Sequence, residues 1–176
     1  MPISAAEGFR AWHDFYILAG TAAGALIGAM FVVASIGSSH LTREHGPQIS
    51  TYLTPTVIHL STVVFASALA LIPTLEWQPL ALVCGGAGLA GMIYSSVIGW
   101  RIARRREVDW ADQAWYALLP ILAYGIILAS AMTVLLHSTP SLDAFAGGLA
   151  LLVVASLRNA WDMIIYFATR PGHGPQ

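Results

Sequence analysis

Two ionisable side chains and an amide occur together in a long apolar stretch near the C-terminal end of the chain. Arg158, Asn159 and Asp162 lie within five residues of each other. On a helix, Arg158 and Asp162 are four residues apart, so they share a face and can form an ion pair. If this stretch crosses a membrane, such groups must face protein or water. They are therefore candidates for lining an ion or proton path or an anion site, or for a structural pair that locks helices together.

A histidine lies in another apolar stretch. His59 follows Thr54 and Pro55, which suit the N-cap and the first position of a helix. In a chain that crosses a membrane five times, His59 and Asp162 come to a similar depth. A contact between them would be a credible proton relay, although a lone histidine in a helix can also be a hydrogen-bonded packing residue. The candidate polar path therefore comprises His59, Arg158, Asn159 and Asp162.

No residue pattern predicts catalysis or a cofactor. His40, Glu44 and His45 are weak candidates for a metal site, since their spacing matches neither of the zinc motifs built on two histidines and a glutamate. A solvated loop is the alternative for them. The sequence contains no nucleophile-elbow motif and no phosphate-binding loop. Cys84 is the only cysteine, which excludes an intrachain disulfide. We expect no catalytic residues, no cofactor and no bound metal.

Glycines recur at helical spacing in two further apolar stretches. They are Gly20, Gly24 and Gly28 in the first stretch and Gly85, Gly88 and Gly91 in the third. Small residues on one face of a helix let another backbone approach closely. These glycines predict either an interface between copies of the chain or packing of the first and third stretches on each other within one chain.

The composition is that of a membrane protein. Of the 176 residues, 57% are hydrophobic and 10% are charged, whereas soluble domains average about 25% charged residues. The basic residues are eight arginines with no lysine, against nine acidic residues. Without a basic stripe to neutralise phosphates, the chain is not expected to bind nucleic acid.

Five windows are long and apolar enough to cross a hydrocarbon core about 30 Å thick. They cover residues of about 15–38, 55–75, 80–100, 114–136 and 142–169. We predict an all-α integral membrane bundle of five transmembrane helices in a single domain, residues 1–176. The alternative is a four-span protein with one re-entrant helix. The N-terminus lacks the basic region of a signal peptide, so the first window is interpreted as a retained span.

The arginines predict the orientation of these spans. In a five-span chain, six arginines in loops and the tail lie on one side, and Arg10 is alone on the other. Positively charged loops stay in the cytoplasm. We therefore expect the N-terminus outside, the C-terminus in the cytoplasm, and a multi-pass location in a cell inner membrane.

Segments at both ends of the chain carry a resemblance. They are residues 12–16 (WHDFY), the small-residue run 20–28, residues 31–35 (FVVAS) and residues 158–162 (RNAWD). In these segments the chain resembles a group of small, uncharacterised bacterial inner-membrane proteins. The resemblance implies location and architecture and no chemistry.

Two functions fit these observations. The first is a homo-oligomeric channel or small transporter for ions, protons or small solutes, with the polar path inside it and the glycines closing its interfaces. The second is an accessory or scaffold protein in the lipid bilayer that packs against larger membrane complexes. An intramembrane enzyme or metal binder is a third reading, with only His13, His40, His45 and His59 as ligands.

Overall fold

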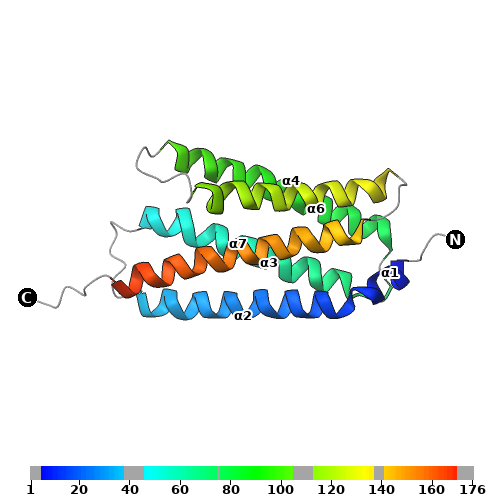
Figure 1. The fold of residues 1–176 in the computed structure, drawn as a ribbon, viewed down its shortest axis with the longest axis horizontal. Coiled ribbons are helices and arrows are strands. Elements are labelled where there is room, and N and C mark those ends of the chain that lie inside the picture. Colours follow the sequence, from blue (N-terminus) through cyan, green and yellow to red (C-terminus); the bar gives the residue numbers. More distant parts are fainter. Residues whose placement is uncertain (1–4, 38–45, 75, 105–112, 137–140, 170–176) are drawn as a thin grey trace, which may run out of the picture.

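The computed structural model is a bundle of long helices that run along one axis (Figure 1). It describes residues 5–37, 46–74, 76–104, 113–136 and 141–169. In these residues every regular element is helical. The elements are α1 (Ala5–Ala11), α2 (His13–Gly37), α3 (Gly46–Ala70), α4 (Trp77–Ala103), η3 (Ala114–Leu118), α6 (Leu119–Leu135) and α7 (Leu142–Thr169).

Five of these helical segments are long and apolar enough to span a membrane. Their candidate spans are His13–Val32, Leu53–Ala70, Trp77–Ala103, Ala114–Leu135 and Leu142–Ile165. Each of the five windows found in the sequence overlaps one of them. The all-α class and the number of helices long enough to span a membrane are thus confirmed, and the fourth span includes the π-helical turn η3.

The helix that contains Pro55 begins earlier than the sequence suggested. Pro55 was expected at the first position of its helix, but α3 already begins at Gly46 and passes through it. A proline removes one backbone hydrogen bond, and the rest of a long packed helix tolerates that loss. Pro120 lies at the start of α6, directly after η3. The wider π turn is a common way to accommodate a disturbed hydrogen-bond ladder.

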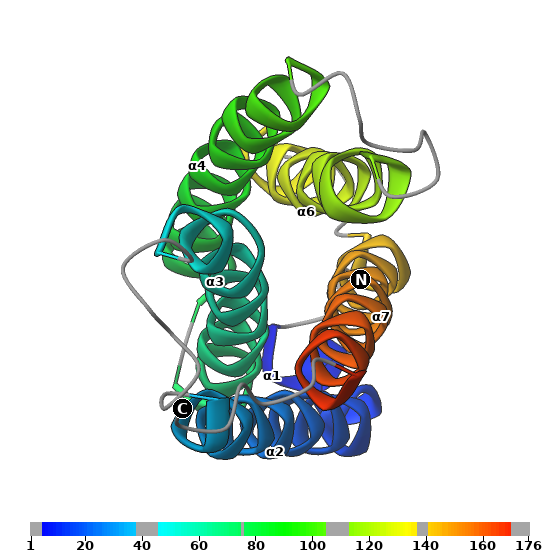
Figure 2. The same ribbon diagram turned by 90° about the vertical axis from the view of Figure 1, so that its left-hand side faces the viewer.

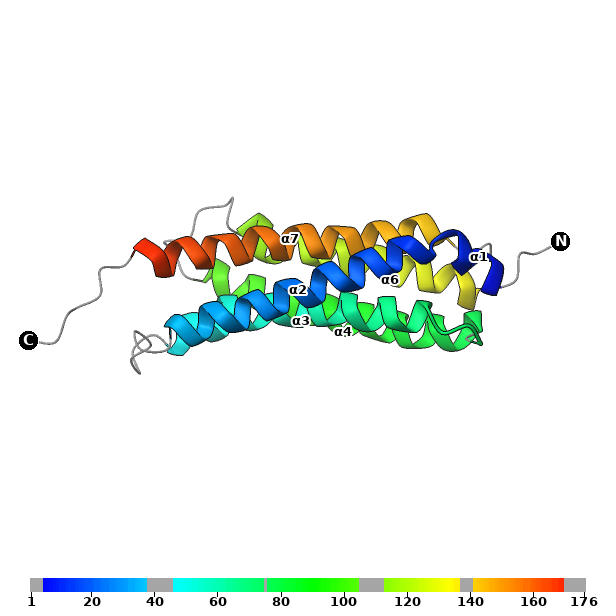
Figure 3. The same cartoon turned by 90° about the horizontal axis from the view of Figure 1, so that it is seen from below.

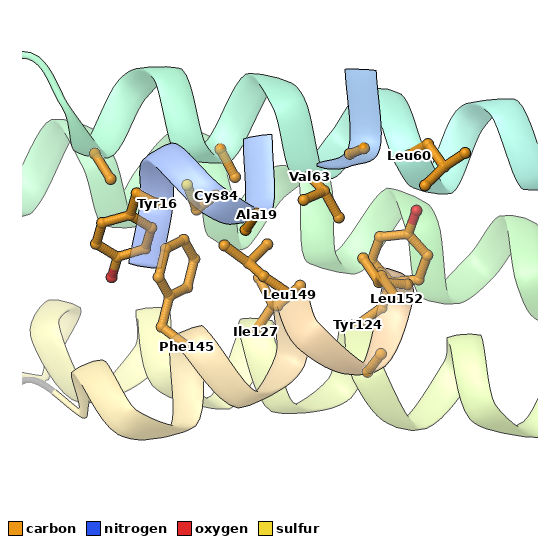
Figure 4. Close-up of a cluster of buried hydrophobic side chains, with 14 of the residues drawn as sticks. Tyr16, Ala19, Leu60, Val63, Cys84, Tyr124, Ile127, Phe145, Leu149 and Leu152 are labelled. Carbon is orange, nitrogen blue, oxygen red and sulfur yellow. The ribbon is translucent and has the colours of Figure 1, made fainter. Parts of the chain in front are cut away.

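The five long helices surround a common centre. Seen along the axis, their order around it is α2, α3, α4, α6 and α7, and each packs on its neighbours (Figure 2). Apolar side chains fill the centre (Figure 4). The largest of them with almost no exposed surface are Tyr16, Leu60, Val63, Tyr124, Ile127, Leu149 and Leu152.

The short helix α1 covers one end of this core. It lies beside the start of α2, at the end of the bundle where α7 begins (Figure 3). The Phe9 ring is 4.8 Å from the Trp77 ring and 5.9 Å from the Tyr16 ring, measured between centroids. These aromatic contacts tie α1 to α2 and α4 and close the core at that end.

The glycines of α4 pack against α6 within the chain. A Cβ atom added at Gly85 would lie 3.1 Å from the Ala131 side chain, and one at Gly88 would lie 3.1 Å from the Leu128 backbone. At Gly91 it would overlap the Tyr124 ring. The predicted packing of the first and third spans on each other is therefore wrong. Small residues permit close approach to any helix, so their spacing alone does not identify the partner.

The glycines of α2 divide into two groups. The main partners of α2 are α3 and α7, and Gly20 faces Ser67 of α3 at 3.1 Å from an added Cβ. Gly24 and Gly28 are exposed, and an added Cβ would meet no described atom within 4 Å. The packing within the chain thus uses Gly20 and leaves Gly24 and Gly28 uncovered.

We expect Gly91→Ala to destabilise the bundle, because the new methyl group must displace the Tyr124 ring. Overpacking of this kind typically costs about 1–3 kcal/mol. Thermal unfolding in detergent should show a lower midpoint for this variant. Gly86→Ala is the matched control, since Gly86 is on the same helix with no atom within 4 Å of an added Cβ. Equal midpoints for the two variants would contradict this account of the helix interface.

Candidate functional site

His59 lies on the inner face of α3, in the same buried row as Leu60, Val63 and Ala66. Only 1% of its surface is exposed. The imidazole Nδ1 is 2.9 Å from the hydroxyl oxygen of Tyr124, which comes from α6. A histidine buried among apolar side chains is thus held by a hydrogen bond to another helix, which is the arrangement expected of a buried polar group.

Tyr124 connects three helices. Its ring lies over Gly91 of α4, where a side chain would overlap it, and its hydroxyl reaches α3. There it is also 3.2 Å from the Thr62 hydroxyl, which donates a hydrogen bond to the Ile58 carbonyl at 3.0 Å. We call His59, Thr62 and Tyr124 the His–Tyr–Thr cluster.

The sequence analysis did not identify Tyr124. The one available signal is its position: a tyrosine near the middle of an apolar span is far from the interfaces where tyrosine usually lies. Its hydroxyl therefore needs a partner inside the protein. Which partner it finds depends on how α3, α4 and α6 pack, and the sequence does not show this.

Two further polar side chains are buried on α7. Asn159 is 1% exposed, and Ser156 has no exposed surface. Within the described part of the chain, the Asn159 amide nitrogen and oxygen have no hydrogen-bond partner. The same is true of the Ser156 hydroxyl. An unpaired buried polar group costs about 1–3 kcal/mol or more. Tyr16, Ser67 and Ser95 also have buried hydroxyls without a partner among the described residues.

The antiparallel packing of α3 and α7 sets the level of these residues along the axis. Leu60 of α3 and Leu152 of α7 lie near each other along the bundle (Figure 4). Ser156 and Asn159 are four and seven residues further along α7, and His59 is one residue away from Leu60 in the same direction. Because each residue advances a helix along its axis, Ser156 and Asn159 lie beyond the level of His59. The buried polar groups therefore continue from the cluster toward the end of the bundle where α7 finishes.

Arg158 and Asp162 form the ion pair that their spacing predicts. Their side chains are 41% and 30% exposed, so the pair lies on the flank of α7. The hypothesis that His59 meets Asp162 is wrong: Asp162 pairs with Arg158, and His59 bonds to Tyr124. The apolar face of α7 turns toward the centre, which brings Asn159 inward and leaves its charged neighbours outside. Of the predicted polar path, only His59 and Asn159 are in the core.

The weak metal candidates His40, Glu44 and His45 lie outside the described residues. Among the residues that are described, no group of three or more His, Cys, Asp or Glu side chains is placed to hold a metal ion. His13 and Asp14 are in contact at 3.1 Å on the exposed start of α2.

The described part of the bundle is tightly filled. Its two best-formed pockets have cavity volumes of about 30 and 10 Å³, and their linings are mainly apolar. Such volumes hold about one water molecule. The larger pocket lies under α1, against Phe9, Trp77 and Phe145. Neither pocket can contain an organic solute.

We expect the single variant Arg158→Gln to destabilise the bundle in a bilayer more than the double variant that also carries Asp162→Asn. The same holds for the single variant Asp162→Asn. Either single change leaves an unpaired charge on a helix flank that faces lipid, whereas the double variant leaves none. A double-mutant cycle of unfolding free energies should give a coupling of about 0.5–3 kcal/mol. Additive effects of the two changes would show that the pair is not coupled.

Comparison with known proteins adds no further constraint. No protein-family model, no curated protein and no solved structure matches the chain.

Proposed function

We propose that the protein is a multi-pass membrane protein that moves protons across the bilayer, with His59 as the group that binds the proton in transit. The observation that carries this proposal is the burial of His59, hydrogen-bonded to Tyr124, within a bundle of five span-length helices. Ionisable groups in such positions are costly and are generally retained for function. Histidine is the side chain whose ordinary pKa suits proton uptake and release near neutral pH.

The size of the cavities favours a proton over a larger substrate. Neither of the two pockets described among the placed residues, of about 30 and 10 Å³, has room for an organic solute. A proton needs only a series of hydrogen-bonding groups or waters. Ser156 and Asn159 offer unpaired donors and acceptors between the level of His59 and one end of the bundle, which makes them candidates for the route on that side.

The direction of this route follows from the proposed orientation. From the arginine-rich loops we propose that the end of α7 is in the cytoplasm and the N-terminus outside, in a bacterial-type inner membrane. Ser156 and Asn159 would then connect His59 with the cytoplasm. The Arg158–Asp162 pair lies beside this route on the flank of α7 and is not part of it.

We further propose that the protein forms homo-oligomers through α2. Support comes from the uncovered glycines Gly24 and Gly28, which contrast with Gly20 on the same helix. Small residues of this kind let two helices pack closely in a membrane, where van der Waals contact drives their association. An accessory protein that packs against a larger membrane complex would use the same face of α2. The two proposals differ in whether a second copy of this chain or another protein covers Gly24 and Gly28.

Under an inward proton gradient, we expect liposomes that contain the purified protein to acidify faster than empty liposomes. A cation ionophore balances the charge of the protons that enter. His59→Gln should reduce this flux by about tenfold or more, because loss of a proton-binding group has effects of that order. Ser96→Ala is a control, since that exposed hydroxyl bonds only to the Met92 carbonyl in the described chain. Circular dichroism and gel filtration should show that each variant is folded. No protein-dependent flux between about pH 5 and pH 8 would refute the proposal.

The oligomer prediction concerns the native complex. After mild extraction, we expect a uniform particle that contains only this chain, and Gly24→Leu with Gly28→Leu should reduce its mass. Gly147→Leu is the matched control, because Gly147 of α7 is also exposed with no atom within 4 Å of an added Cβ. A stable complex with a different protein, lost in the double variant only, would support the accessory role instead.

A further inference from the structure

The hydrogen bonds of the His–Tyr–Thr cluster assign the protonation state of His59. We propose that Tyr124 and Thr62 hold neutral His59 with its hydrogen on Nδ1, so that the imidazole takes up and releases protons only through Nε2. The tautomer follows from the geometry alone. Its role in proton movement rests on the proposed function.

The assignment begins at Thr62, whose hydroxyl has a single hydrogen. That hydrogen is used in the bond to the Ile58 carbonyl, 3.0 Å away and able only to accept. In its contact with Tyr124, at 3.2 Å, the Thr62 oxygen must therefore be the acceptor. The one hydroxyl hydrogen of Tyr124 then points to Thr62. His59 Nδ1, 2.9 Å from the Tyr124 oxygen, must supply the hydrogen for that third contact.

The opposite tautomer leaves the cluster unsatisfied. If Nδ1 carried no hydrogen, Tyr124 would have to donate to it, and the oxygens of Tyr124 and Thr62 would face each other without a hydrogen between them. The hydrogen of His59 would then be on Nε2, which has no hydrogen-bond partner among the described residues. That tautomer leaves an N–H without an acceptor, whereas the first leaves only an unshared lone pair on Nε2. All the contacts are satisfied only with the hydrogen on Nδ1.

This chain of bonds cannot carry a proton onward. It runs from Nδ1 through Tyr124 and Thr62 and ends at the Ile58 carbonyl, which has no proton to release. When Nε2 gains a proton, the Nδ1–H bond to Tyr124 remains in place, and the same proton must leave from Nε2. His59 is therefore a proton-binding site with a single exit, and Tyr124 is its positioning residue.

Packing keeps the two rings in this arrangement. The His59 and Tyr124 rings meet at 60°, with centroids 5.4 Å apart, and both side chains are almost fully buried. Because the Tyr124 ring lies over Gly91, a swing of the hydroxyl away from α3 would require the α4–α6 interface to open. The tautomer is thus tied to the contact between α4 and α6.

Nitrogen NMR of the full chain in lipid tests the assignment, because protonated and unprotonated imidazole nitrogens have distinct chemical shifts. The six histidines are labelled with ¹⁵N, and the His59 signals are those missing from the His59→Gln spectrum. At about pH 8.5, two units above the ordinary histidine pKa of about 6.5, we expect a protonated Nδ1 and an unprotonated Nε2.

Variants of Thr62 test the cause. Thr62→Val removes the competing acceptor and keeps the shape, so the Tyr124 hydrogen should turn to Nδ1 and move the His59 hydrogen to Nε2. Thr62→Ser and the control Ser96→Ala should keep the original pattern. A hydrogen on Nε2 in the unaltered protein, or no change in Thr62→Val, would overturn this inference. Absence of proton flux with the expected spectra would instead refute the proposed function and leave the tautomer assigned.

Discussion

The pairing of buried polar atoms is the constraint on which this bundle depends. Span-length helices with apolar outer faces offer polar side chains few partners, so a buried polar group that forms a hydrogen bond usually does so with a neighbouring helix. Tyr124 meets this need for α3, since its hydroxyl contacts both His59 and Thr62. This hydroxyl thus adds a directional contact between α6 and α3 to the apolar packing of α6 on α4.

Glycine makes that contact possible. A tyrosine in the middle of a tight helix bundle needs space that its neighbours must give up, and Gly91 provides it on α4. The other contact glycines of α4 bring its backbone close to α6 over the length of the interface. The glycines of α4 thus shape the interior, whereas Gly24 and Gly28 of α2 are uncovered within the described chain.

Charged and neutral polar groups are separated on α7. Arg158 and Asp162 neutralise each other on the flank, while Asn159 and Ser156 enter the core without charge. This arrangement keeps the strong field of an ion pair away from His59 and leaves hydrogen-bonding atoms near it.

The sequence alone determined the class of the fold and the number of helices that are long and apolar enough to span a membrane. Apolar windows of about 20 residues between polar turns leave few alternatives to helices long enough to cross a bilayer. The four-residue spacing also determined the Arg158–Asp162 pair, because that contact is local to one helix. The tertiary structure decided every contact between helices. Gly91 packs against Tyr124 of α6 and not against α2. His59 bonds to Tyr124 and not to Asp162. Helix rotation and partner choice depend on the packing of all five helices together, and small residues or a lone histidine fit several such arrangements equally well.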